Sequence, residues 1–214
     1  MKLNTRIERK IKKYDPAGGL AQTARTILAL SGVNHAPVKP HLQRVALLVE
    51  ALAEKRGKDA KAAFFGGLLH DVGKILLPYQ LFDGHNIDSD EYAEVKKHSI
   101  AGFEAFRELH LFTSLCAGCH HAMYANGYGL EMIDFPKEWG LHTVRKVLDI
   151  SAMISVCDFI DAFKHRDTDI KDGSNKDAPD LRTMLVKKYP DDMQIIDVAL
   201  RVCMDKVFWE EVAA

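Results

Sequence analysis

The chain has 214 residues, which is long enough for one well-packed domain and short for two. Apolar residues make up 47% of the sequence and charged residues 28%, an ordinary balance for a globular protein. The formal net charge of −1 excludes a bulk field that attracts nucleic acid or an anionic membrane, so we expect neither as a stable partner. Any attraction for an anion must come from local groups.

No stretch of the sequence predicts export or insertion into a membrane. The basic N-terminus is not followed by the apolar segment of a secretory signal, and no apolar run reaches the roughly 20 residues of a membrane span. Four cysteines in a chain of this length do not predict a disulfide scaffold. We therefore expect a cytoplasmic protein.

The periodicity of apolar residues predicts helices. They recur at steps of three and four almost throughout, and no stretch alternates as a β-strand does. The sequence therefore predicts an all-α fold, a single compact bundle of several helices. We expect residues 1–35 to form a helical N-terminal extension and residues 36–214 to form the main domain.

Capping and breaking residues set the expected helix ends. Gly57 ends one helix, and Asp59 caps the next, which Pro78 ends. Asp88 and Glu91 form a capping box that opens another helix. The expected helices span residues 20–30 (ended by Ser31-Gly32), 39–56, 59–77, 88–109, 112–123 and 143–164, with two more separated by Pro190 and a cap at Asp191 or Asp192. Loops are expected at residues 79–86 and 166–178.

A His-Asp pair follows the apolar run at residues 64–69. A carboxylate such as Asp71 is costly after such a run unless something compensates its charge, and a cation does so. The imidazole of His70 beside this carboxylate suits a transition metal, and the carboxylate can bridge two ions. The alternative is a hydrogen-bonded, structural pair at the end of a helix.

Other histidines and acids lie on the apolar faces of their expected helices. A lone histidine in such a position is more often a hydrogen-bonded core residue than a metal ligand. Five such elements in one chain are poorly explained by chance. They are, in chain order, His41, His70-Asp71, His98, His120-His121 and Asp158.

The order of these elements and their local sequences resemble the HD superfamily, in particular its HD-GYP branch of cyclic dinucleotide phosphodiesterases. The resemblance covers about residues 38–165. The strings that carry it are HLQRV at 41–45, LHDVGK at 69–74, VKKHSIAG at 95–102 and VCDFIDA at 156–162.

This resemblance implies a dinuclear metal site containing iron or manganese, as two divalent or mixed-valence ions. The implied ligands are His41, His70, Asp71 and Asp158 for one ion, and His98, His120 and His121 for the other, with Asp71 bridging. Asp71 and Lys74 are the implied catalytic residues, and Lys74 would bind a phosphate as a point charge. Asp161 lies one turn after Asp158. It either orients a metal ligand or a water molecule without contacting the metal itself, or it is an exposed helix acid.

The sequence departs from the HD-GYP pattern in several places. The Glu that usually follows the double histidine is Ala122, and the Pro of the GYP segment is Gly129. Some relatives hold a third metal with a Glu where this chain has Pro37, so we expect a dinuclear site. The Arg-rich segment is reduced to residues 164–166. These changes weaken the case for cyclic di-GMP as substrate.

The expected function is hydrolysis of a phosphodiester or phosphomonoester in a nucleotide-like substrate, with a cyclic dinucleotide as the first specific hypothesis. A nucleotidase or small phosphatase is the second reading. Two alternatives come from other classes: a non-catalytic regulator that binds a nucleotide or a protein partner, and oxygen activation by a mixed-valence di-iron site.

The run Cys116-Ala117-Gly118-Cys119-His120 also matches the attachment motif for c-type haem. Haem attachment requires export and would take His120 from the metal site. We expect the two cysteines to be small buried residues, with a redox pair as the alternative.

Overall fold

The computed structural model describes residues 2–165, 180–205 and 208, and its regular elements there are all helices. The all-α prediction is confirmed, while the loop expected at 166–178 lies outside the described residues. The helices are α1 (Leu3–Tyr14), α2 (Gly19–Asn34), α3 (Val38–Lys55), α4 (Ala60–Leu69), α5 (Ser89–Lys96), α6 (His98–Phe106), α7 (Leu111–Cys119), α8 (Leu141–His165), α9 (Leu181–Lys188) and α10 (Met193–Met204), with short 3-10 helices η1 (Val72–Leu76), η2 (Tyr79–Phe82) and η3 (Met132–Asp134).

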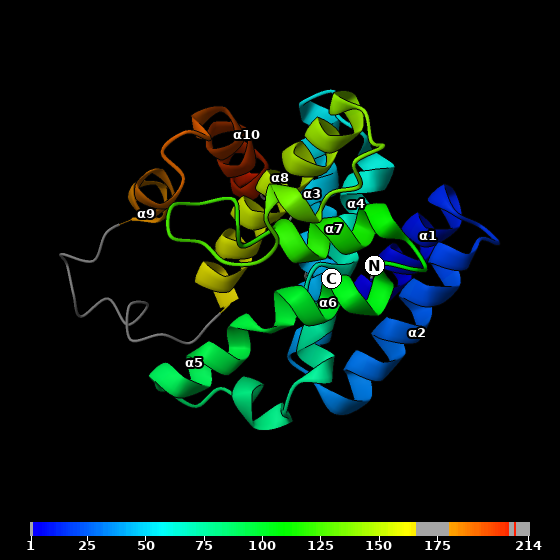
Figure 1. The fold of residues 1–214 in the computed structure, drawn as a ribbon, viewed down its shortest axis with the longest axis vertical. Helices are drawn as coiled ribbons and strands as arrows, with labels where there is room; N and C mark the ends of the chain where they lie inside the picture. The colour runs from blue at the N-terminus through cyan, green and yellow to red at the C-terminus, as the bar shows by residue number, and fades with distance from the viewer. Residues whose placement is uncertain (1, 166–179, 206–207, 209–214) are drawn as a thin grey trace.

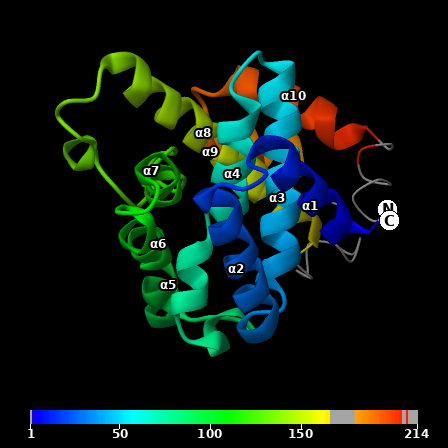
Figure 2. The same ribbon diagram turned by 90° about the vertical axis from the view of Figure 1, so that its right-hand side faces the viewer.

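Helix α3 forms the centre of the bundle, packed against α4 and α8 (Figures 1 and 2). Its residues Leu42, Val45 and Leu52 are fully buried. A Cβ atom at Gly67 of α4 would lie 3.0 Å from the Cα atom of Ala46 in α3, so the glycine permits the two helices to approach closely. This close packing brings the start of α3 and the end of α4 together.

Two further pairs of helices flank this centre. Helices α1 and α2 pack beside α3 on one side, while α9 and α10 lie against α8 (Figure 1). Within the helical extension expected at residues 1–35, the sequence placed a helix only at 20–30 and not at α1, because the two buried residues of α1, Ile7 and Ile11, are separated by charged ones. Helix α2 also runs past the stop expected at Ser31-Gly32, because the Ser31 hydroxyl donates to the Ile27 carbonyl (2.8 Å) and does not interrupt the helix.

Three helices that were expected to be continuous end or break beside a histidine. The helix expected at 59–77 ends at Leu69 and gives way to η1, the one at 88–109 breaks at Lys97, and the one at 112–123 ends at Cys119. At the last of these breaks the backbone tightens, because the Ala122 N–H donates to the carbonyl only three residues earlier (2.8 Å). The short stretch η2 also replaces part of the loop expected at 79–86.

Several predicted helix ends are confirmed. Asp59 caps α4 by accepting from the Ala62 N–H (2.9 Å), and the capping box of Asp88 and Glu91 opens α5. Asp192 is the N-cap residue of α10 but its side chain makes no cap hydrogen bond. Within the described ranges, no helix combines the length and the apolar composition that crossing a membrane requires.

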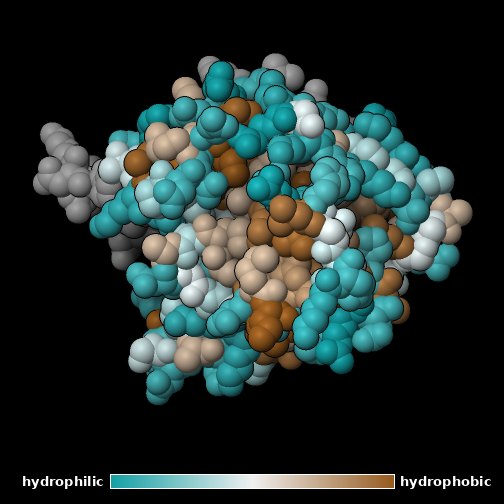
Figure 3. All heavy atoms as spheres, turned by 45° about the horizontal axis from the view of Figure 1, so that its top comes forward, coloured by the Kyte–Doolittle hydropathy of each residue, from teal (hydrophilic) through white to brown (hydrophobic). Residues whose placement is uncertain are grey.

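The molecular surface is mostly polar but includes some apolar area. On the face shown in Figure 3, hydrophobic side chains gather near the middle and are bordered by hydrophilic ones. Large apolar side chains with high exposure in the described residues include Leu109, Ile133 and Leu141. Because apolar atoms contribute more than half of a typical protein surface, this area alone does not indicate a partner.

Candidate metal centre

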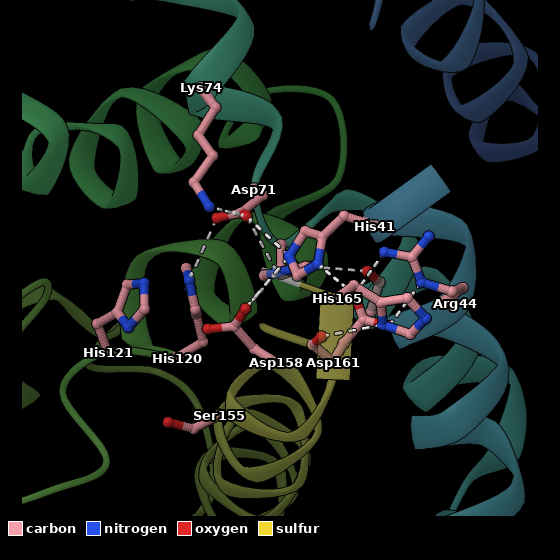
Figure 4. Close-up of polar contacts among 12 residues, drawn as sticks. His41, Arg44, Asp71, Lys74, His120, His121, Ser155, Asp158, Asp161 and His165 are labelled. Atoms are coloured by element: carbon pink, nitrogen blue, oxygen red, sulfur yellow. Dashed lines mark hydrogen bonds and ion pairs between the residues drawn. The ribbon is translucent and has the colours of Figure 1, made fainter. Parts of the chain in front are cut away.

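A cluster of histidine and aspartate side chains lies where α3, α4, α6, α7 and α8 meet (Figure 4). It contains all seven residues that the sequence singled out as candidate ligands. They form two groups that share one aspartate. The first group is His41, His70, Asp71 and Asp158, and the second group is Asp71, His98, His120 and His121. Within each group the candidate ligand atoms all lie within 4.8 Å of one another.

Asp71 is fully buried between the two groups, and each of its oxygens faces one of them. Oδ2 lies 3.2 Å from Nε2 of His41 and 3.3 Å from Nε2 of His70. Oδ1 lies 3.0 Å from Nε2 of His98 and 3.6 Å from Nε2 of His120. A carboxylate in this position can contact two cations at once.

Three of the histidines are oriented by the backbone of their own segment. In each, Nδ1 faces the carbonyl oxygen three residues earlier, and a carbonyl only accepts, so Nδ1 carries the proton. The distances are 2.8 Å from His70 to Gly67, 2.6 Å from His98 to Val95 and 2.7 Å from His120 to Ala117. The lone pair is then on Nε2, which faces the centre. This arrangement is typical of histidines that bind metals.

His41 is oriented by a carboxylate. Its Nδ1 lies 2.8 Å from Oδ2 of Asp161, while its Nε2 lies 3.2 Å from both Asp71 and Asp158. Burial lowers the pKa of His41, but the negative charges of these three nearby carboxylates outweigh it and raise the pKa to about 10. The side chain of Asp161 is 1% exposed, so the expectation of an exposed helix acid is wrong for this residue.

Several polar atoms in the cluster are buried without a hydrogen-bond partner. They include Nε2 of His41, Nε2 of His70 and Oδ1 of Asp71. With its proton on Nδ1, His98 also directs a lone pair at the Asp71 carboxylate across 3.0 Å. Lone pairs that face one another in a buried site are unfavourable, and a cation between them removes the cost. The residues present therefore fit the binding of metal.

The pKa values of Asp71, His120 and His121 keep these three residues in the form that binds metal, whereas the raised pKa values of His41 and His70 mean that these rings must lose a proton before they bind metal. Burial alone raises the pKa of Asp71, but the positive charge of Lys74 and the imidazole of His70 help to hold it well below its usual range. Burial lowers the pKa of His120 to about 4 and holds that of His121 well below its usual value. An ionised carboxylate and neutral imidazoles are the protonation states of metal ligands.

Residues 39–187 match the family model of the HD domain. The chain belongs to the HD domain family. Its members are mostly metal-dependent phosphohydrolases and bind divalent metals, in agreement with a His/Asp cluster that could hold metal. A comparison with curated proteins finds no match. The division into residues 1–35 and 36–214 stays a prediction.

Lys74 lies beside the HD motif, at the edge of the cluster (Figure 4). It follows Asp71 by one turn, on η1, and its Nζ atom contacts Oδ2 of that aspartate. The side chain is only 11% exposed, so its ammonium group is held near the centre. A positive charge in this position can bind an anion that approaches the cluster.

The sequence did not predict the role of two tyrosines of the HD domain. The ring of Tyr128 stacks on the ring of His121 with centroids 4.6 Å apart, and the Tyr124 hydroxyl lies 3.4 Å from Nδ1 of His121. Gly129 gives the following loop its shape: its φ is +123°, which proline cannot adopt, and a Cβ there would lie 2.2 Å from the Gly118 carbonyl oxygen. The glycine that departs from the HD-GYP pattern is thus required by this loop.

The two cysteines near His120 are buried and form no disulfide. Cys116 is fully buried and Cys119 is 1% exposed, and both are free. Burial raises the pKa of Cys119 to about 12, so its thiol is protonated and unreactive at neutral pH. These positions agree with the interpretation of the cysteines as small packing residues, while His120 belongs to the metal cluster.

Proposed function

We propose that this HD domain is a dinuclear metal-dependent phosphohydrolase that acts on a nucleotide-like phosphoester. The observation that carries the proposal is the buried carboxylate of Asp71, with one oxygen toward each group of histidines. We assign the first group to one ion and the second group to the other, with iron or manganese as the metals. The assigned ligands are His41, His70, Asp71 and Asp158 for one ion, and Asp71, His98, His120 and His121 for the other.

Two ions bound in this way would supply a water nucleophile with a lowered pKa and would neutralise the charge of the phosphate oxygens. The side chains of the chain hold and orient this site. Asp71 joins the two groups, and the backbone carbonyls behind His70 and His98 fix their rings. The ammonium group of Lys74 binds a non-bridging phosphate oxygen and keeps the scissile phosphate beside the nucleophile.

The surroundings of His121 support a substrate that carries a planar base and more than one phosphate. Beyond His121 lie the rings of Tyr124 and Tyr128, and aromatic rings bind nucleobases by stacking. Nζ of Lys188 lies 4.0 Å from the ring centroid of Tyr124, and Nζ of Lys96 lies 5.9 Å from that of Tyr128. A cyclic dinucleotide has both features, so we place the chain near the HD-GYP branch.

Metal content and turnover test this proposal together. Protein reconstituted with Mn²⁺ or Fe²⁺ should hydrolyse bis(p-nitrophenyl) phosphate, and chelation should abolish turnover. Comparing cyclic dinucleotides with mononucleotides then distinguishes a phosphodiesterase from a nucleotidase. Bound metal without turnover of any phosphoester would contradict the proposed activity and favour a regulator or oxygen chemistry, for which oxygen uptake is the assay.

The matched variants are Asp71→Ala and Asp149→Asn. Asp149 is an exposed acid of α8 that pairs with Lys58, away from the cluster. Asp71→Ala should lose both metal and turnover, whereas Asp149→Asn should retain both. Equal activity in the two variants would mean that Asp71 does not organise the site.

A further inference from the structure

The histidines of the metal centre are supported from behind in two different ways. His70, His98 and His120 each direct Nδ1 at a neutral backbone carbonyl of their own segment. His41 instead directs Nδ1 at the charged carboxylate of Asp161, which lies on a different helix (Figure 4). The support of His41 therefore depends on a side chain that substitution can change.

Helices α3 and α8 interlock through two pairs of residues with the same spacing. His41 and Arg44 lie three residues apart on α3, and Asp158 and Asp161 lie three residues apart on α8, so each pair shares one helix face. His41 contacts both aspartates, at 3.2 Å and 2.8 Å. Arg44 reaches Asp161 through two bonds, from Nε to Oδ1 (2.7 Å) and from Nη2 to Oδ2 (2.8 Å).

This two-bond contact fixes the carboxylate that orients His41. The side chain of Asp161 is 1% exposed, and His165 Nδ1 lies 3.2 Å from its Oδ1 atom. An arginine fork determines the plane of a carboxylate as well as its position. The ring of His41 is therefore held with Nε2 toward the first group by a chain of charged hydrogen bonds.

The two groups also differ in the donors that they offer. The first group has two carboxylates and two imidazoles, and the second group has three imidazoles and only the shared carboxylate of Asp71. Lys74 offsets part of the charge on one Asp71 oxygen, but Asp158 adds a full carboxylate to the first group. Ionised carboxylates favour hard cations such as Mn²⁺ more than neutral imidazoles do.

We propose that the two metal positions bind Mn²⁺ unequally, with the first group as the tight, retained position and the second group as the exchangeable one. Asp161 and Arg44 are positioning residues that act through His41 on the tight position alone. This inference rests on the proposed function, because it takes the seven clustered residues as metal ligands. It implies that the fraction of protein with metal bound at the second group rises and falls with the concentration of free metal.

Titration of metal-free protein with Mn²⁺ tests the inference, with free Mn²⁺ measured by electron paramagnetic resonance. The wild-type protein should bind in two steps of different affinity. Asp161→Asn keeps the shape of the side chain but removes its charge, and it should weaken the tight step about 10- to 100-fold while leaving the weak step within about twofold. Asp149→Asn, on the same helix and paired with Lys58 at the surface, is the control and should change neither step.

Arg44→Lys provides a second variant that leaves α8 intact. It keeps the positive charge but loses the fork, so it should weaken the same step by a smaller factor. Two equal steps in the wild type, or an equal loss in both steps with Asp161→Asn, would overturn this inference and leave the proposed function standing. An absence of Mn²⁺ binding in the wild type would overturn both.

Discussion

Gly73 lies between Asp71 and Lys74 on the segment that carries the HD motif, and it allows η1 to contact α6. A Cβ atom added at Gly73 would lie 1.9 Å from the backbone oxygen of His98 and 2.8 Å from the backbone nitrogen of Gly102. Both are backbone atoms of α6, so no side chain can rotate to make room. Gly73→Ala must therefore move η1 away from α6.

The size of this movement follows from the contact distance. Since Cβ atoms almost never lie within 3.0 Å of such an atom, the two segments must separate by about 1 Å. Oδ1 of Asp71 and Nε2 of His98 are 3.0 Å apart and lie on the two segments that separate. We expect the variant to lose about 1–3 kcal/mol of unfolding free energy. Misplacement by this distance should lower turnover about 100-fold.

Three measurements check this prediction: urea unfolding, Mn²⁺ titration and hydrolysis of a nitrophenyl phosphodiester. Because His98 belongs to the second group, the weak binding step should suffer most, the opposite of the pattern expected for Asp161→Asn. Gly19→Ala is the control, since a Cβ atom there meets nothing within 4 Å. A Gly73→Ala protein with wild-type metal binding and turnover would refute the reasoning.

Three further predictions concern charge, protons and packing. Lys74→Ala should keep its metal but lose about 100- to 1000-fold in turnover, with partial recovery in Lys74→Arg; loss of metal instead would contradict a role in binding phosphate. A metal binds only neutral imidazole, and the pKa of His41 is about 10. Metal binding at pH 8 should therefore release about one proton, and the apparent affinity for metal should rise with pH up to about pH 10. Calorimetric titration in buffers of different ionisation enthalpy measures this release, and an affinity that is constant between pH 7 and 9 would argue against it. Cys116→Ser should lower the unfolding free energy by about 1–2 kcal/mol without changing metal content, because the residue is fully buried. A redox role predicts instead that oxidation alters the activity of the wild-type protein and that this response is lost in Cys116→Ser.

The candidate ligands could be found from the sequence because each breaks an apolar pattern. Asp71 and Asp158 are acids within otherwise hydrophobic stretches, and His41 lies on the inward face of its helix. Helical spacing fixes which side of a helix a residue occupies, so inward-facing His and Asp residues on several helices predict a common centre. The structure brings them together in two groups joined by one carboxylate.

The details that the sequence did not predict depend on contacts between distant segments. The helix breaks beside His70, His98 and His120 accompany ring-to-carbonyl hydrogen bonds that direct each Nε2 at the centre. The spacing placed Asp161 one turn after Asp158, but its burial depends on Arg44, more than a hundred residues earlier in the chain. Local patterns carry no information about such partners.

The central claim is that two metal ions share Asp71, and the number of ions per chain tests it most directly. Elemental analysis of protein reconstituted with Mn²⁺ should give about two ions per chain in the wild type and far fewer in Asp71→Ala, because that variant removes the carboxylate common to both groups. A wild-type protein that retains no metal, or an Asp71→Ala protein that retains the full amount, would contradict the account.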